Sequence, residues 1–133
     1  MSQVHPTVRY LIVCEDAKTD PDKPSRISLL GLISAIRSLE KPPYPLLYSE
    51  FCVFLQLTEC RGPAEGRIEI QQADSGKVVF RTKKRTLPLA EDPLEIVGVV
   101  FRIRNVLFEG PGLYWVQFWY NEEMIAQQPL LLR

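Results

Sequence analysis

The chain of 133 residues contains few side chains that could carry out acid–base, nucleophilic or metal chemistry. Its one histidine, His5, is the residue type most often used as a general base, but it lies in an N-terminal segment of the kind that frays. The glycines form neither the GxxxxGKS/T nor the GxGxxG phosphate-binding pattern. We therefore predict that the protein is not an enzyme and has no catalytic residue, no cofactor and no bound metal.

The three cysteines, Cys14, Cys52 and Cys60, show no Cys-x-x-Cys spacing, which argues against a zinc site and a disulfide framework. Cys52 and Cys60 share one expected strand, where the extended chain holds them too far apart for a disulfide. A bridge from Cys14 to either one stays open. Reduced, buried thiols in a cytoplasmic protein are the simpler interpretation.

Four carboxylates gather early in the chain, at Glu15, Asp16, Asp20 and Asp22. Loop carboxylates can bind calcium, which takes about six to eight oxygen ligands. This run is interrupted by lysines and lacks the Asp-x-Asp-x-Asp-Gly spacing of a calcium loop. We interpret it as a solvated loop between the first two strands.

The basic residues form one cluster, which contains Lys77, Arg81, Lys83, Lys84 and Arg85. A nucleic-acid binder usually has a basic excess, whereas here sixteen Lys and Arg balance sixteen Asp and Glu. Charged side chains on an exposed strand edge discourage aggregation. We interpret the cluster as edge protection and expect no nucleic-acid partner.

Apolar and polar residues alternate with a period of two between frequent prolines and glycines, which is typical of β-strands. No window has the apolar stripe of a helix. The sequence predicts an all-β fold, an antiparallel β-sandwich of about 7–8 strands, immunoglobulin-like, in a single domain over 1–133. The expected strands are 8–14, 26–36, 50–60, 65–73, 76–82, 96–106, 113–120 and 124–132. Alternation predicts the inward sides of three of them: Phe51, Val53, Leu55 and Leu57; Ile68 and Ile70, with Arg67, Glu69 and Gln71 outside; and Val99, Phe101 and Ile103, with Arg102 and Arg104 outside.

Two further segments bear on organisation and location. The proline-rich segment 41–45 (KPPYP) is interpreted as a stiff crossover from one sheet to the other. No apolar run approaches the ~20 residues of a membrane-spanning helix, and the N-terminal residues do not form a signal peptide. We expect a cytoplasmic protein without a membrane partner.

The stretch 108–123 (FEGPGLYWVQFWYNEE) is the most strongly patterned part of the chain. Its Gly-Pro-Gly at 110–112 predicts a tight corner, because glycine accepts positive φ and proline fixes its own. Tyr114 then stands where an immunoglobulin-like sandwich has its tyrosine corner, whose hydroxyl bonds to upstream backbone. We therefore expect the Tyr114 side of this strand to face the core.

The opposite side of the same strand carries Trp115, Gln117 and Trp119. Two outward indoles flanking an amide are typical of a surface for a partner protein, a sugar face or a second subunit. These three residues are the candidate partner-binding face. Whether a neighbouring segment such as 41–45 covers the indoles stays open.

Four segments together resemble an uncharacterised bacterial all-β family: CED near the start, RISLLGLIS, FCVFLQLT and the final FEGPGLYWVQFWYNEEMIAQQPLLL. The resemblance covers most of the chain and implies a small immunoglobulin-like sandwich, but no activity, cofactor or catalytic residue. The last hairpin departs from the common Asp-Gly turn by having Asn121-Glu122, which leaves the register of the last strand open.

These observations favour a non-catalytic β-sandwich protein that acts as a protein-interaction or assembly module. Its partner would be an unknown protein or a second copy of itself, bound through the Trp115/Trp119 side or by strand addition at the edge of the last strand. The alternative is a small-molecule-binding protein or enzyme whose pocket lies among the loops at one end of the sandwich, lined by loop carboxylates or by Arg102 and Arg104.

Overall fold

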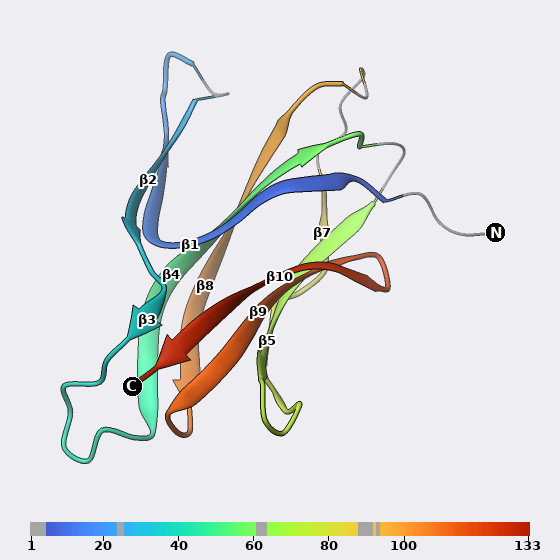
Figure 1. Cartoon of the computed structure of the whole chain (residues 1–133). Helices are drawn as coiled ribbons and strands as arrows, with labels where there is room; N and C mark the ends of the chain where they lie inside the picture. Colours follow the sequence, from blue (N-terminus) through green and yellow to red (C-terminus); the bar gives the residue numbers. More distant parts are fainter. Residues whose placement is uncertain (1–4, 24–25, 61–63, 88–91, 93) are drawn as a thin grey trace.

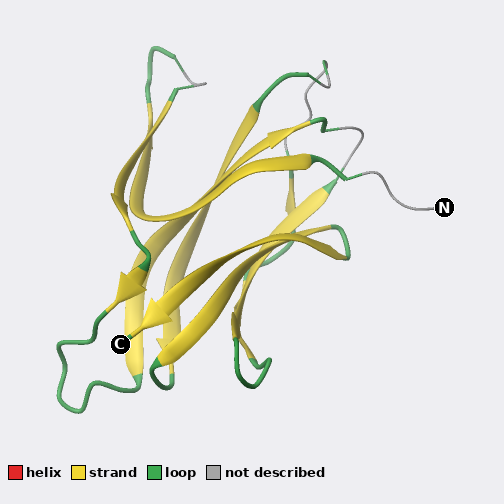
Figure 2. Cartoon of the chain, viewed as in Figure 1, coloured by secondary structure: helices red, strands yellow, loops and turns green. Residues whose placement is uncertain are grey.

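The computed structural model describes residues 5–23, 26–60, 64–87, 92 and 94–133 as two β-sheets packed face to face (Figures 1 and 2). Within these residues there are ten strands and no helix, which confirms the predicted all-β sandwich. The strands are β1 Thr7–Thr19, β2 Ile27–Leu32, β3 Ala35–Ile36, β4 Leu46–Thr58, β5 Glu65–Gln72, β6 Val78–Arg81, β7 Arg85–Thr86, β8 Val97–Phe108, β9 Gly112–Tyr120 and β10 Glu123–Leu132.

The first sheet has the strand order β2-β1-β4-β8, and the second has the order β3-β10-β9-β5-β6 with β7 also paired to β5. All pairings are antiparallel except that between β10 and β3, which is parallel. The two layers are visible in Figure 1, with β1 and β4 in one and β9 and β10 in the other. Residues 41–45 lie between β3 of the second sheet and β4 of the first, as expected for a crossover.

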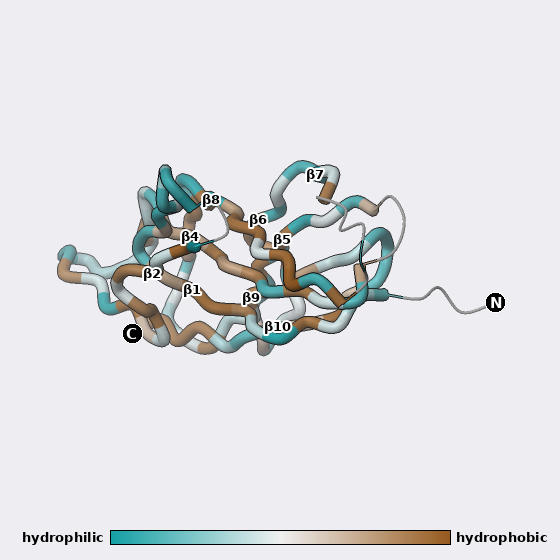
Figure 3. The backbone as a smooth tube through the Cα atoms, turned by 90° about the horizontal axis from the view of Figure 1, so that it is seen from above, coloured by the Kyte–Doolittle hydropathy of each residue, from teal (hydrophilic) through white to brown (hydrophobic). Residues whose placement is uncertain are grey.

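The core lies between the sheets and is built by alternate residues of the long strands, whose apolar colouring is visible in Figure 3. Phe51, Val53, Leu55 and Leu57 all have 0% exposure, as the alternation in β4 predicts. The facing strands contribute Ile68, Ile70, Val99, Phe101, Ile103, Val116 and Phe118. Such a continuous core is what stabilises a sandwich of this size without a disulfide.

Tyr114 forms the predicted corner contact. Its side chain is 1% exposed, and its hydroxyl donates a 2.8 Å hydrogen bond to the carbonyl oxygen of Gly110. The ring packs edge-on against Phe108, with 5.0 Å between the ring centroids. The corner thus ties the end of β8 to the start of β9 and sets which side of β9 enters the core.

Two expected strand boundaries were wrong. β1 continues to Thr19, so that Glu15 and Asp16 lie within a strand and only Asp20 and Asp22 lie in the loop that follows. The expected strand 26–36 is two strands, because β2 ends at Leu32, just after the positive φ of 66° at Gly31, and the chain crosses to the second sheet at Ile33 and Ser34. Such a change of sheet is a tertiary event that alternation along the chain does not report.

The ends of the other strands also differ from expectation. β4 begins four residues earlier than predicted and stops before Glu59, which has a φ of 61°. The last hairpin has a two-residue turn at Asn121-Glu122, with a φ of 53° at Asn121. The pairing of β9 with β10 shifts its register between Met124 and Ala126. The short strand β7 was not predicted, because two residues are too few to show the alternation of apolar and polar side chains.

The Tyr114 hydroxyl offers a direct test of the corner. Replacing Tyr114 with Phe removes one buried hydrogen bond without changing the packing of the ring. We therefore expect the free energy of unfolding, measured by urea titration, to fall by about 1 kcal/mol. Tyr120→Phe is the matched control, because the hydroxyl of this 4%-exposed residue makes no hydrogen bond within the described part of the chain. Equal stability losses in the two variants would contradict a structural role for the corner bond.

Candidate binding face

Trp115, Gln117 and Trp119 lie on the outer side of the second sheet, opposite the core side of β9. The two indoles are partly buried rather than fully exposed, and Gln117 between them is only 6% exposed. Four residues along a strand correspond to about 13 Å, so the indoles stand at separate places on the face. Strict alternation therefore located these side chains correctly, and the contacts recorded for them come from residues of β5, β9 and β10.

On the outer side of the second sheet, side chains of neighbouring strands lie in rows across the sheet. We call the surface formed by these side chains the tryptophan face. β9 is the middle strand, with β5 on one side and β10 on the other. Cross-strand partners form three rows: Arg67–Trp119–Met124, Arg81–Glu69–Gln117–Gln127 and Gln71–Trp115–Pro129. Each indole thus has a polar or cationic neighbour on β5 and an apolar one on β10.

Gln117 holds the middle of this face together. Its side-chain nitrogen donates to Gln71 at 2.9 Å and to Gln127 at 3.2 Å, and its side-chain oxygen accepts a 3.2 Å hydrogen bond from the indole N–H of Trp119. Both amide protons are therefore used within the sheet. The geometry makes Gln117 a positioning residue for Trp119, with one acceptor lone pair left over.

Glu69 is a carboxylate on the outer side of a sheet, yet it is 2% exposed. Arg81 donates to it from Nε, and the Nη2 of Arg67 lies 3.9 Å from its other oxygen. Arg67 also stacks over the ring of Trp119, with 4.7 Å from the guanidinium carbon to the ring centroid. A buried carboxylate is stable only when paired in this way, so these side chains fix one another's positions.

A cleft of about 280 Å³ opens at the end of the tryptophan face near the β9–β10 turn. It is lined by Arg67, Arg81, Thr82, Lys84 and Glu122. Lys84 donates to Glu122 at 2.9 Å, and this ammonium holds the pKa of the Glu122 carboxyl below its usual value. We call this site the cationic cleft.

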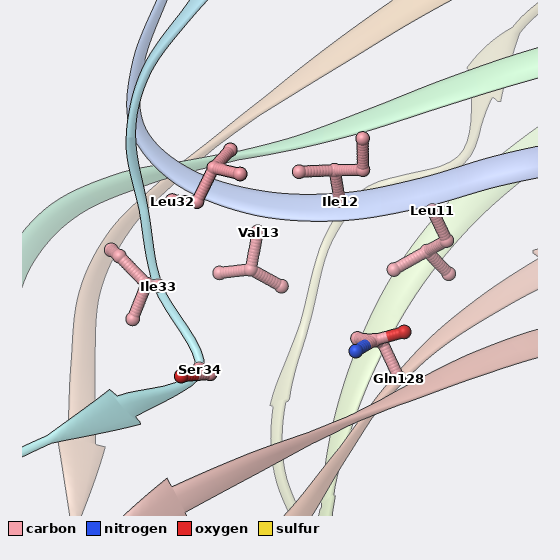
Figure 4. Close-up of a pocket in the computed structure, with 7 residues that line it drawn as sticks. All are labelled: Leu11, Ile12, Val13, Leu32, Ile33, Ser34 and Gln128. Atoms are coloured by element: carbon pink, nitrogen blue, oxygen red, sulfur yellow. The ribbon is translucent and has the colours of Figure 1, made fainter.

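A larger cavity, of about 430 Å³, lies along the side of the sandwich between β1 and β10 (Figure 4). Leu11, Ile12 and Val13 of β1 face it from one side and Gln128 of β10 from the other. Leu32, Ile33 and Ser34 complete its lining. This cavity is mostly apolar and does not lie among end loops, and neither Arg102 nor Arg104 lines it, in contrast to the pocket expected from the sequence.

The outer side of the first sheet is organised around Arg102. Its guanidinium donates to Asp16 at 3.1 Å and to the carbonyl oxygen of Ala17 at 3.0 Å, and it lowers the pKa of the Asp16 carboxyl. Cys14 and Cys52 stand directly opposite each other beneath it as free thiols, both with 0% exposure. The acidic residue Asp16 is thus an ion-pair partner in a strand and not part of a loop.

Sequence reasoning found the indoles of β9 but missed their partners on β5 and β6. Arg67 and Glu69 were expected only as outward-facing residues, and Arg81 only as part of a basic edge. β6 is indeed the edge of the second sheet, but Arg81 turns onto the face to pair with Glu69. The alternation of Arg67 and Glu69 with buried isoleucines was the one available signal, and it does not show which strand lies beside β9.

Sequence comparison places the chain among proteins without a known role. The model of a family of unknown function, DUF6941, matches residues 9–133. The chain belongs to this family. This agrees with the expected uncharacterised all-β family, and no protein of curated function shows significant sequence similarity to the chain.

A solved structure of a much larger protein shows a similar fold. The chain superimposes over 99% of its length on 31% of the alkylpurine DNA glycosylase AlkC of Pseudomonas fluorescens bound to DNA containing an abasic site analog, with a TM-score of 0.52 and 17% identity. It also aligns with 19% of a beta-D-glucoside glucohydrolase from Trichoderma reesei, at a TM-score of 0.47 and 13% identity. The chain thus spans less than a third of either protein, and the first likeness shows the fold alone.

The positioning role of Gln117 can be tested by removing its amide. Gln117→Leu keeps the size of the side chain but leaves Trp119, Gln71 and Gln127 without their shared partner, so we expect a loss of about 1–3 kcal/mol in the free energy of unfolding. Gln127→Ala removes one of the three bonds and is expected to cost less. Denaturant titration followed by fluorescence measures both, and a smaller loss for Gln117→Leu would contradict the role.

The three thiols provide a test of the first sheet and of the end of β4. Burial raises the pKa of the Cys14, Cys52 and Cys60 thiols above their ordinary value of about 9, which lowers the thiolate fraction that reacts. We expect N-ethylmaleimide to modify the native protein far more slowly than the urea-unfolded chain, as followed by mass spectrometry. Since folding favours the neutral thiols, their stabilising effect is lost as pH rises through the raised pKa values. Rapid labelling of Cys14 or Cys52 in folded protein would contradict their burial.

Proposed function

We propose that the protein is a non-catalytic interaction module that binds another protein chain through the tryptophan face. The observation that supports this is a pair of partly buried indoles on the outer side of one sheet, of which Trp119 is held in place by Arg67 and Gln117. Trp and Arg are the residue types that contribute most to protein interfaces. Side chains that are already held in place lose little conformational entropy on binding.

The remaining exposed surface of the indoles accounts for useful affinity. Covering each one contributes roughly 2 kcal/mol through apolar burial and aromatic contacts. Met124, which is 37% exposed and lies beside Trp119, extends the apolar area onto β10. Together these side chains form the apolar centre of an interface, and Gln71, Arg81 and Gln127 form its polar surround.

Two other modes are less favoured by the geometry. The C-terminal end of β10 is paired with β3 at Leu131 and Leu132, so only its earlier residues form an open edge, and Pro129 there lacks a backbone donor. The cavity between β1 and β10 has the size of a ligand pocket, but among the described residues that line it only Ser34 and Gln128 are polar. Neither feature offers an anchor comparable with the held indole of Trp119 and its neighbour Trp115.

The proposal predicts where a bound chain can be captured. A photo-crosslinking amino acid placed at Met124 should form an adduct in living cells, and Trp115→Ala with Trp119→Ala should abolish that adduct. The matched control is Leu30, 45% exposed on β2 of the other sheet, where no adduct depending on these tryptophans should form. Light scattering after size exclusion shows whether the captured chain is a second copy. Adducts at Leu30 alone, or adducts at Met124 that survive in a folded double variant, would overturn the proposal.

A further inference from the structure

The cationic cleft carries an excess of positive charge next to the tryptophan face. Three cations, Arg67, Arg81 and Lys84, line it together with one carboxylate, Glu122. The buried carboxylate of Glu69 pairs with both arginines and balances one of them. The local balance is therefore positive, in a protein whose formal net charge is +0. A cleft with this charge attracts an anion.

The cleft also has hydrogen-bond donors that find no acceptor among the described residues. Arg81 donates to Glu69 from Nε only, so both of its terminal nitrogens remain available, and its side chain is 60% exposed. Thr82 accepts a 2.9 Å hydrogen bond from the backbone N–H of Ile68, which leaves its hydroxyl proton free to donate. Lys84 uses one proton on Glu122 and keeps two.

Arg67 lines the cleft and connects it to the tryptophan face. Its side chain is 11% exposed, and its Nη1 donates to the carbonyl oxygen of Asn121 at 3.0 Å. Its Nε is buried and has no acceptor in the described part of the chain. Buried donors of this kind are usually paired. Since Arg67 also stacks on Trp119, an anion that engages it changes the surroundings of that indole.

We propose that the cationic cleft binds a carboxylate of an acidic segment in the partner chain. This rests on the proposed function, because the same partner would cover the indoles. The terminal nitrogens of Arg81 form a fork that matches the two oxygens of a carboxylate, and Lys84 and Thr82 donate from the side. Glu122 occupies Lys84 in the free protein and competes with the incoming carboxylate. The partner is thus an acidic chain with apolar side chains flanking its carboxylates.

The test uses Trp119 as its reporter. The chain has two tryptophans, so Trp115→Phe leaves Trp119 as the single indole and keeps an aromatic ring on the face. The probe is a blocked peptide of alternating glutamate and leucine, titrated at low salt, and its control is the same peptide with glutamine in place of glutamate. We expect a saturable change of Trp119 emission with the glutamate peptide only, which weakens as salt is added.

Three variants in this background decide the assignment. Arg81→Ala should weaken binding of the glutamate peptide by about 10-fold or more, because it removes a charge-assisted, bidentate contact. Glu122→Gln should strengthen binding by about 2- to 5-fold, because it removes the competing carboxylate, and a folding defect would not produce this sign. Lys77→Ala is the matched control, because this lysine pairs with Glu109 outside the cleft and its loss should leave the affinity unchanged.

The alternative outcomes overturn the inference in distinguishable ways. Equal binding of the glutamate and glutamine peptides would show that the cleft does not recognise a carboxylate. Inorganic phosphate that binds more tightly than the peptide, with the same dependence on Arg81, would make the cleft a phosphate site instead. If neither probe binds, the cleft is not an anion site. An adduct at Met124 that depends on the tryptophans would still support the proposed function in each of these cases.

Discussion

Burial of Tyr114, Val116 and Phe118 between the two sheets is the constraint on which the candidate binding face depends. These side chains fix the orientation of β9, the middle strand of the second sheet, and the corner bond from Tyr114 to Gly110 fixes where the strand begins. Since successive side chains of a strand point to opposite faces, Trp115 and Trp119 have no other place than the outer side. Packing in the core thus determines the surface on the far side of the sheet.

The outer side is itself more ordered than a solvated sheet surface requires. Glu69 and Gln117 are buried there beneath their neighbours. Gln117 bonds to Gln71 of β5 and Gln127 of β10, and Glu69 pairs with Arg67 of its own strand and Arg81 of β6. Removing any one partner leaves one polar atom of a buried side chain with fewer bonds, which is costly. The indoles, arginines and amides are therefore coupled, and the face keeps a defined shape without a bound partner.

The chain illustrates the separation between fold and function. It belongs to a family of unknown function, and a similar fold forms part of a DNA glycosylase of which it covers 31%. A sandwich supplies two outer sides, two ends and open edges, and any of these can carry a site. In this chain the aromatic residues and the unused donors meet on one of them, at Arg67.

Among the described residues no helix is long and apolar enough to cross a membrane, and no group of three His, Cys, Asp or Glu side chains is arranged to hold a metal ion.

The local pattern of residues was sufficient to predict much of the fold and the part of the site that lies on β9. Alternation identified the inward residues of β4, β5, β8 and β9, and Gly-Pro-Gly before Tyr114 identified the corner. The same pattern could not reveal that 26–36 divides between two sheets after Leu32, or that β1 runs on to Thr19 and places Asp16 beside Arg102. Alternation describes one strand at a time, and these features depend on which strands are neighbours.

The sequence by itself therefore determined that the chain is an all-β sandwich and that Trp115, Gln117 and Trp119 point away from its core. The tertiary structure alone decided that Arg67 stacks on Trp119, that Glu69 is buried between two arginines and that Arg81 and Lys84 share a cleft with Glu122. The physical reason is that some features depend on one residue's own backbone and others on contacts between distant parts of the chain. Side-chain direction is set by the backbone of each residue, whereas pairing and burial are set by register between strands that are distant in the chain.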